Sequence, residues 1–356
     1  MTAATGQDPV LVDDEVDEAV ERRTTRIDVS THGLRLDKLL VTLAGEFSRS
    51  HLQHLIEAGH VQVDGRVATQ ASRKVTAGQQ VEVALMPTAQ STAFRAEPMA
   101  LAIVHEDEHL LVIDKPAGLV VHPAAGHWSG TLLNGLLAHH AGAAALPRAG
   151  IVHRLDKDTS GLMLVARTLV AQTALVRAIA DRSVHRESLA LVHGDLTGTA
   201  PGRPLRIDAA IGRDPVSRVR MALVASGKPA MTDVMWLGGS RVSIGPAGPA
   251  GGVAAASARA VSAVHCKLHT GRTHQIRVHL ASRGHPLLAD ALYGGAPALD
   301  LTRQALHAAR LSLIHPVDGR ELSFQAPLPS DLSQAWLTIC GTPYGGLPAW
   351  DYNRRR

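Results

Sequence analysis

Two short segments of the chain gather the side chains that could do chemistry. Residues 150–162 (GIVHRLDKDTSGL) place charged and hydroxyl side chains between two apolar stretches and end in a Ser-Gly turn. A carboxylate in such a loop, at the end of a buried strand, can act as a nucleophile or a base. The alternative is a structural turn in which Asp and Ser side chains cap backbone groups. The residues alone leave both interpretations open.

The second segment is residues 270–279 (TGRTHQIRVH), in which we expect Thr273 to cap a helix. Ile276 and Leu280 would share one face of this helix, which leaves Arg277 close to its positive N-terminal end. A buried arginine at a helix start can pair with a carboxylate and keep it ionised. The alternative is a surface arginine in a weak ion pair.

A dense run of histidine and cysteine overlaps the second segment. It consists of His265, Cys266, His269, His274 and His279. Such ligands suit zinc. However, we expect His265 and His269 on an alternating strand, and the later histidines at a helix that ends near Ser282. The chain also has no C-x-x-C pair. We therefore predict no metal site.

The chain also has no G-x-x-x-x-G-K-[ST] loop, no G-x-G-x-x-G after a strand and no H-E-x-x-H, which argues against ATP, dinucleotide and zincin chemistry.

The whole chain has the composition of a folded protein. Its 356 residues predict two or three domains, and 45% hydrophobic against 19% charged residues argues against global disorder. We find no apolar run long enough for a membrane span and no signal peptide, and two cysteines suit a reducing compartment, so we expect a cytoplasmic protein. Aromatic residues make up only 3%, and no tyrosine precedes Tyr293.

Charge is distributed unevenly along the chain. Residues 1–28 hold eight acidic residues and three arginines, whereas the remainder holds 33 basic against 24 acidic residues. A basic body behind an acidic segment indicates a polyanionic partner, although charge alone does not separate nucleic acid from acidic small molecules.

Composition shifts and turn residues divide the chain into segments. We predict an acidic disordered leader over 1–30, a compact unit of two helices and a hairpin over 31–86, a linker over 87–100, a larger domain over 101–340 with a flexible insertion at 238–260, and a tail over 341–356. Strands of the larger domain arrive irregularly rather than as βαβ repeats. This favours an α+β fold over a doubly wound sheet.

With these segments in view, the chain resembles the RluA-type family of pseudouridine synthases, specifically the subgroup with an N-terminal RNA-binding domain that modifies large-subunit ribosomal RNA. The motif HRLDKDTSGL at 153–162 carries the resemblance, supported by DKPAGL at 114–119, GRTHQIRVH at 271–279 and LHA at 306–308. Residues 31–86 are similar to the small RNA-binding domain named after a small-subunit ribosomal protein. The resemblance covers about residues 31–340.

The resemblance implies isomerisation of uridine in RNA to pseudouridine, on a mixed, mainly antiparallel sheet. Asp156 would be the essential carboxylate, and whether it attacks the sugar, attacks the base or takes a proton stays open. Arg277 would pair with Asp156 in catalysis, and Arg154 would contact RNA as the uridine flips out. His153 is a further candidate substrate-binding residue, and Ile276 would pack beside the base. No cofactor is implied, RNA is the implied partner, and no obligate protein partner is evident.

One departure from the family pattern touches the candidate site. In the segment VHRESLALV at 184–192, Ser188 stands where the family has its active-site tyrosine, and Arg186 stands where lysine is usual. Ser188 keeps a hydroxyl but loses the ring that would stack on the base, a contact worth about 1–3 kcal/mol. The main hypothesis is an RNA pseudouridine synthase that acts on large-subunit rRNA. The alternative is a catalytically impaired paralogue that binds rRNA as an assembly factor. A smaller departure is Ala289, where glycine is common.

Overall fold

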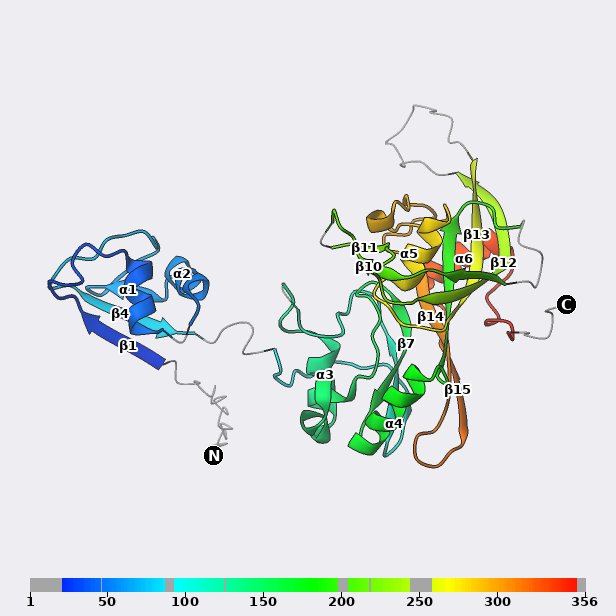
Figure 1. Ribbon diagram of the computed structural model, residues 1–356, viewed down its shortest axis with the longest axis horizontal. Helices are drawn as coiled ribbons and strands as arrows, with labels where there is room; N and C mark the ends of the chain where they lie inside the picture. Colours follow the sequence, from blue (N-terminus) through cyan, green and yellow to red (C-terminus); the bar gives the residue numbers. More distant parts are fainter. Residues whose placement is uncertain are drawn as a thin grey trace, which may run out of the picture. The chain divides into compact units, whose positions relative to one another are not determined.

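The computed structural model describes residues 21–45, 47–86, 93–124, 126–197, 204–217, 219–243 and 258–350. The chain forms two compact units, Met1–Thr92 and Ala93–Arg356, each with a hydrophobic core of its own (Figure 1).

The N-terminal unit packs two helices against a four-stranded antiparallel sheet. Its elements are β1 (Glu21–Arg26), α1 (Leu36–Leu43), α2 (Arg49–Glu57), β2 (Val61–Val63), β3 (Arg66–Val67) and β4 (Gln80–Leu85), in the strand order β1-β4-β2-β3. Ser48 caps α2 by accepting a hydrogen bond from His51 N. Asp64 and Gly65 both have positive φ, 53° and 74°, as a two-residue hairpin between twisted strands requires.

The leader predicted over 1–30 extends too far into the fold. Residues 21–26 form the edge strand β1, paired with β4 from Glu21 opposite Leu85 to Arg26 opposite Gln80. Ile27 follows, only 3% exposed in the core. The strand itself consists of Glu, Arg and Thr, so backbone pairing rather than an apolar pattern places it in the sheet, and the sequence offered no such signal. Residues 1–20 lie outside the described residues.

The second unit is built on a nine-stranded sheet in the order β5-β6-β7-β14-β8-β13-β12-β9, with β15 also paired to β14. The strands are β5 (Ile103–Glu106), β6 (Leu110–Lys115), β7 (Ser160–Ala166), β8 (His185–His193), β9 (Leu205–Asp208), β12 (Met231–Ser243), β13 (Ala258–Leu268), β14 (Leu306–Ile314) and β15 (Glu321–Gln325). Within the described strands only β7 and β14 pair in parallel. This confirms the predicted α+β class and its mixed, mainly antiparallel sheet.

The remaining elements of this unit cover the sheet or connect its strands. They are α3 (Leu132–His139), α4 (Leu169–Ala180), α5 (Gln275–Ser282), α6 (Ser330–Cys340), the hairpin of β10 (Ile211–Arg213) and β11 (Met221–Leu223), and the 3-10 turns η1 (Ala141–Ala145), η2 (Pro147–Gly150) and η3 (Ala291–Tyr293). Thr131 and Thr168 cap α3 and α4 by accepting hydrogen bonds from the backbone N–H groups of Asn134 and Ala171.

Alternation along β8 separates the two faces of the central sheet. Leu189 and Leu191 pack in a cluster with α6, whereas Ala190 and Val192 pack in a cluster with α5. Since side chains two residues apart on a strand share a face, Ser188 projects on the α5 side, together with Arg186. This face of the sheet holds the candidate site.

Two further predicted boundaries need correction. The linker over 87–100 is too long, because the side chain of Asn134 in α3 donates to the carbonyl oxygens of Ala93 and Arg95 and binds that segment to the second unit. The insertion at 238–260 is shorter than predicted, since β12 and β13 pair out to Ser243 opposite Ala258. Local glycine and alanine content hid this long-range pairing. Residues 87–92 and 244–257 lie outside the described residues.

The tail predicted over 341–356 packs on the fold through residue 350. The ring of Tyr344 lies 5.2 Å from that of Trp336 in α6, and Leu347 is buried in the same cluster. Residues 351–356 lie outside the described residues.

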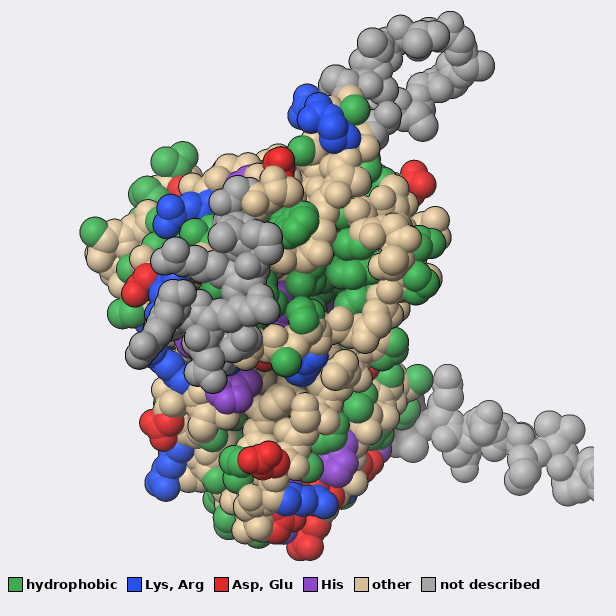
Figure 2. All heavy atoms as spheres, turned by 90° about the vertical axis from the view of Figure 1, so that its right-hand side faces the viewer, with side chains coloured by type: hydrophobic (Ala, Val, Ile, Leu, Met, Phe, Trp, Pro, Cys, Tyr) green, Lys and Arg blue, Asp and Glu red, His purple; other side chains and the backbone are tan. Residues whose placement is uncertain are grey.

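No helix in the described part of the chain is long and apolar enough to cross a membrane. Figure 2 shows charged side chains of both signs at the end of the second unit where the β14–β15 hairpin lies. There Arg320 pairs with Asp107 and Asp318 at 3.0 and 3.2 Å.

Candidate active site

Tight backbone geometry positions the loop that carries Asp156. Arg148, Ala149 and Gly150 all adopt left-handed φ angles, 54°, 52° and 81°. A Cβ on Gly150 would lie 1.9 Å from the carbonyl oxygen of Ala166, so only glycine allows the loop to approach the end of β7 this closely. The loop therefore runs directly beside β7 before it reaches Asp156.

His153 anchors the middle of this loop. Its Nε2 accepts a hydrogen bond from the backbone N–H of Leu164 at 2.9 Å, which fixes the tautomer. Burial, together with the nearby positive charge of Arg186, lowers the pKa of His153 to about 3. His153 is thus a neutral group that ties the loop to β7, and it also lines the cavity beside Asp156.

Lys115 anchors the far end of the loop, a role that sequence reasoning missed. Its fully buried Nζ donates to the carbonyl oxygens of Pro116, Leu119 and Lys157 at 2.7, 3.0 and 2.9 Å. Burial lowers its pKa to about 8, against the attraction of Asp158. Because Lys157 directly follows Asp156, this contact fixes the loop that carries Asp156. A lysine at the end of an apolar strand was the available signal.

Asp156 pairs with Arg277, as predicted for a buried arginine near a helix start. Arg277 Nη1 lies 3.1 Å from Asp156 Oδ2. The same guanidinium makes a bidentate pair with the buried Asp290, from Nε and Nη2, at 2.8 Å each. Although burial opposes its charged form, the hydrogen bonds and charge of Asp290 raise the pKa of Arg277, with Asp156 adding to the effect. Asp290 therefore holds Arg277 so that one N–H faces Asp156.

His274 and Tyr293 complete the surroundings of Asp156. His274 Nε2 lies 4.0 Å from Asp156 Oδ1, and its Nδ1 lies 2.8 Å from the Tyr293 hydroxyl. That hydroxyl accepts from Met221 N, so its own proton is free to be donated to Nδ1, which leaves the His274 proton on Nε2 toward Asp156. Burial lowers the pKa of His274, and Arg277 lies 5.0 Å from the centre of the Tyr293 ring.

The cap of helix α5 lies one residue later than the predicted cap at Thr273. His274 occupies the cap position with φ 56°, and Gln275 is the first helical residue. The Gln275 side chain accepts from Thr270 and from Arg272 N at 2.7 and 3.0 Å, and so holds the preceding turn. This side-chain network, rather than a threonine cap, sets the helix start.

Ile276, the second residue of α5, is expected from the resemblance to pack beside the base. Its side chain is buried between α5 and the sheet, in a cluster with Cys266 and Leu280, and it is absent from the lining of the cavity beside Asp156. Ile276 is thus a core residue of α5, and its packing beside a bound base stays a prediction. Leu280 shares its face, as predicted.

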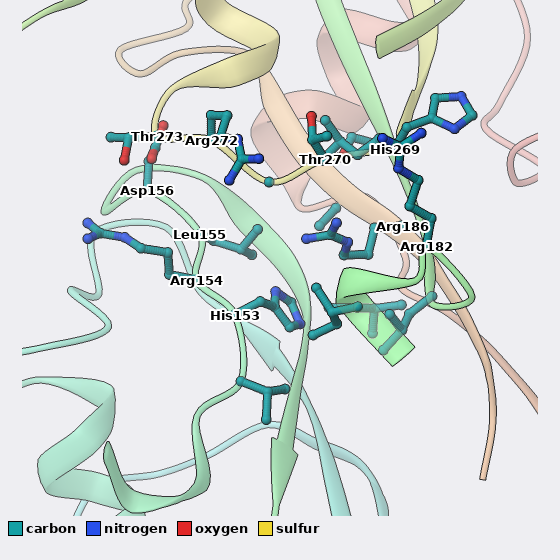
Figure 3. A pocket seen from close by; sticks show the side chains of 18 of the residues that line it. His153, Arg154, Leu155, Asp156, Arg182, Arg186, His269, Thr270, Arg272 and Thr273 are labelled. Atoms are coloured by element: carbon teal, nitrogen blue, oxygen red, sulfur yellow. The ribbon is translucent and has the colours of Figure 1, made fainter. Parts of the chain in front are cut away.

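A cavity of about 470 Å³ opens beside Asp156, and Figure 3 shows the side chains around it. Its lining includes His153, Arg154, Leu155, Arg186 and Ser188, which come from the loop that carries Asp156 and from β8. Asp156 also borders a second cavity of about 480 Å³ together with Arg277. The predicted site residues other than Ile276 thus converge on one region.

Arg154 and Ser188 meet this region in different ways. Arg154 is exposed and borders three adjoining cavities, with its guanidinium directed away from the loop in Figure 3. Ser188 is only 5% exposed and contributes a small polar wall inside the pocket. Its size leaves open the space that a larger side chain on β8 would fill.

The histidine-rich segment is divided between β13 and α5, as expected, and its histidines contact different partners. His265 contacts Glu187, His269 contacts Asp233 and His279 contacts Thr232, at 2.9, 2.8 and 2.9 Å. Among the residues that the structure describes, no three His, Cys, Asp or Glu side chains are grouped to hold a metal ion.

Comparison with known proteins identifies the family. The model of the RNA pseudouridylate synthase family matches residues 109–282, and that of the S4 domain matches residues 34–81. The ribosomal large subunit pseudouridine synthase D of Nitrosomonas europaea is 44% identical over 323 residues, which cover 88% of this chain and 87% of the relative. The chain belongs to the RNA pseudouridylate synthase family.

Further relatives of this pseudouridine synthase agree with the assignment. A protein of the same name from Neisseria meningitidis serogroup B is 46% identical over 312 residues, 84% of this chain and 77% of the relative. The solved structure of human RNA pseudouridylate synthase domain containing 1 matches with a TM-score of 0.51 and 27% identity, over 71% of this chain and 94% of that one. The chain is therefore an isomerase that converts uridine in RNA to pseudouridine, which confirms the resemblance seen in its motifs.

Proposed function

We propose that this synthase modifies specific uridines of large-subunit ribosomal RNA in the cytoplasm, with Asp156 as the essential carboxylate. The observation that supports it most directly is the ion-pair chain Asp290–Arg277–Asp156, which presents one carboxylate to a pocket large enough for a nucleoside. The names of the relatives from Nitrosomonas and Neisseria support the choice of RNA.

The reaction needs one carboxylate and a pocket in which the base can turn. The bond from ribose C1′ to N1 breaks, the base rotates, and C5 joins C1′. C5 then releases its proton to solvent, and N1 gains one. Asp156 acts at the start of this sequence, and Arg277 donates a hydrogen bond to its carboxylate at 3.1 Å.

The other site residues serve RNA binding in this proposal. Arg154 lies at the mouth of the pocket, where it contacts RNA as the uridine leaves its stack, which costs least in a loop or bulge. His153 keeps the pocket wall in place and borders the bound nucleotide. The S4 domain adds a second RNA-binding surface.

The test maps pseudouridine across rRNA in cells with and without this protein, and after rescue with Asp156→Asn. We expect specific pseudouridines to disappear on deletion and to stay absent with the variant. Unchanged modification on deletion would refute the rRNA assignment. Restored modification with Asp156→Asn would refute the role of Asp156.

A second candidate function is favoured by Ser188, which leaves the pocket without an aromatic wall on β8. In that case the chain binds rRNA as an assembly factor with impaired catalysis. Ribosome assembly measured in the same cells separates the two functions. A scaffold predicts normal ribosome assembly with Asp156→Asn and defective assembly on deletion. Catalysis predicts that pseudouridine is lost to the same extent on deletion and with Asp156→Asn.

A further inference from the structure

The guanidinium of Arg186 lies in the cavity beside Asp156 without a bonding partner among the described residues. Its Nε is buried and makes no hydrogen bond, and no ion pair joins Arg186 to any carboxylate of the described chain. The neighbouring acid on β8, Glu187, lies on the other face and pairs with His265 and Arg310. A buried donor without a partner is costly, so it calls for a group that completes it.

The surroundings hold Arg186 in this position. The backbone of β8 at this residue pairs with Leu268 on one side and Leu311 on the other, so the side-chain direction is set by the sheet. A Cβ at Gly271 would lie 2.7 Å from Arg186 Nη1, so the absence of a side chain at Gly271 makes room for the guanidinium. Burial lowers the pKa of Arg186, yet arginine stays charged at neutral pH.

The position of Arg186 in the pocket indicates which part of a nucleotide it meets. Figure 3 shows Asp156 and Arg186 on different sides of the pocket, with Leu155 between them. Of the four other arginines that line this cavity, Arg154 and Arg182 are exposed at the rim, where phosphates remain in solvent. If the ribose of a nucleotide lay at Asp156 and its base extended inward, the edge of the base remote from the sugar would face Arg186.

We propose that Arg186 donates a hydrogen bond to the uracil carbonyl that lies opposite the bond to ribose, and thereby selects uridine over cytidine. This deepens the proposed function, because it rests on Asp156 acting at the sugar. In uridine the atom opposite N1 is C4, which carries the acceptor O4. Cytosine carries an amino group there, a donor that cannot pair with a guanidinium.

The same contact survives the isomerisation. A half-turn of uracil about the line from N3 to C6 exchanges N1 with C5 and O4 with O2. In pseudouridine the atom opposite C5 is C2, which carries the acceptor O2. Arg186 thus meets a carbonyl oxygen before and after the base turns, and it holds the detached base in the pocket between these states.

The first test measures binding apart from chemistry. The probe is a cytidine oligonucleotide of about 12 nucleotides with one central uridine, one central pseudouridine or neither. The protein is the full chain with Asp156→Asn, so that no turnover occurs. We expect the uridine and pseudouridine probes to bind at least about 10-fold more tightly than the cytidine probe, as for a hydrogen bond from a charged donor. We expect Arg186→Met to remove this preference.

Two further variants control this measurement. Arg182→Met removes another lining arginine and should keep the preference for uridine while reducing the salt dependence of binding. Gly271→Ala keeps the charge of Arg186 but displaces its guanidinium tip, which is flexible enough to move at little cost in stability. We expect Gly271→Ala to reduce the preference with an unchanged melting temperature.

The outcomes separate this inference from the proposed function. Loss of the preference in Arg186→Met but not in Arg182→Met supports the inference, even if rRNA carries no pseudouridine made by this enzyme. No preference in the parent protein, or equal preference in Arg186→Met, overturns it. Modification of rRNA by Arg186→Met at the parent rate overturns it as well, while leaving the proposed function intact.

Discussion

Asp290 is the residue that turns Arg277 into a fixed partner for Asp156. A lone arginine on a helix end keeps several rotamers, whereas a bidentate pair with a fully buried carboxylate leaves one. The remaining N–H then points at Asp156 at 3.1 Å. In the proposed function, the chemistry at Asp156 therefore depends on a carboxylate, Asp290, that need not touch substrate.

For this reason Asp290→Asn should lower kcat about 10- to 100-fold with little change in KM, since the amide accepts fewer bonds and releases Arg277. Tritium release from uridine-labelled rRNA measures both constants. Asp37→Asn is the control, because Asp37 is an equally buried partner of Arg35 in the N-terminal unit. A kcat loss shared by Asp37→Asn, at saturating RNA, would refute the positioning role.

In the proposed function, Ser188 is the residue on β8 that would face the bound base. Restoring a ring with Ser188→Tyr should raise kcat/KM about 5- to 100-fold, because stacking on a base contributes roughly 1–3 kcal/mol. The same tritium release measures it, with Ser188→Leu to separate stacking from mere filling of the pocket. Equal rates for the parent and Ser188→Tyr would mean that another residue has taken over this role.

At the scale of elements, turns that close against backbone position the site. The turn after α5 carries Asp290, and Ala289 precedes it with φ 56°, a conformation that strains any side chain. The hydrogen bond from Ala289 N to Ala296 O at 3.0 Å holds this turn in place. Ala289 stands where the family pattern commonly has glycine, and its left-handed φ is the physical reason that glycine suits this position.

Ala289→Gly should therefore stabilise the protein by about 0.5–1 kcal/mol. Relief of a left-handed alanine gains roughly 1–2 kcal/mol, and the extra freedom of glycine in the unfolded chain offsets about half. Urea unfolding followed by circular dichroism measures the change. Ala263→Gly in β13 should destabilise the protein instead, and the same sign for both variants would contradict the strain.

At the scale of the whole molecule, buried neutral histidines link stability to pH. Burial lowers the pKa of His122 and His307 to about 4, with nearby arginines adding to the effect, and that of His153 to about 3. Each has an ordinary pKa of 6.5 when unfolded. Between these values the unfolded chain binds more protons than the folded chain, so stability is lost as pH falls.

We expect the free energy of unfolding to decrease from pH 6.5 to pH 4, by at most about 1.4 kcal/mol per pH unit for each histidine. Urea titrations across this range measure the slope, and His307→Gln should make it shallower. His32, an exposed-loop histidine in the N-terminal unit, provides the control His32→Gln. A slope unaffected by His307→Gln would rule out this source of acid sensitivity.

The sequence by itself determined the local features of this protein. Helix caps at Ser48 and Thr131, the apolar strand from Leu110 and the placement of Arg277 near a helix start follow from short-range signals. These signals depend on side chains within a few residues of one another, so the folded structure retains the local features that they predict. The ordered motifs also sufficed to indicate the family.

Only the tertiary structure decided what those features meet. The polar strand β1 joins a sheet through backbone bonds to β4, and Lys115 reaches the carbonyl of Lys157 across 42 residues. Arg277 finds both Asp156 and Asp290, whereas Ile276 turns into the core. Pairing between distant strands sets these contacts, and a residue's type and neighbours in sequence do not encode the partner that the fold brings to it.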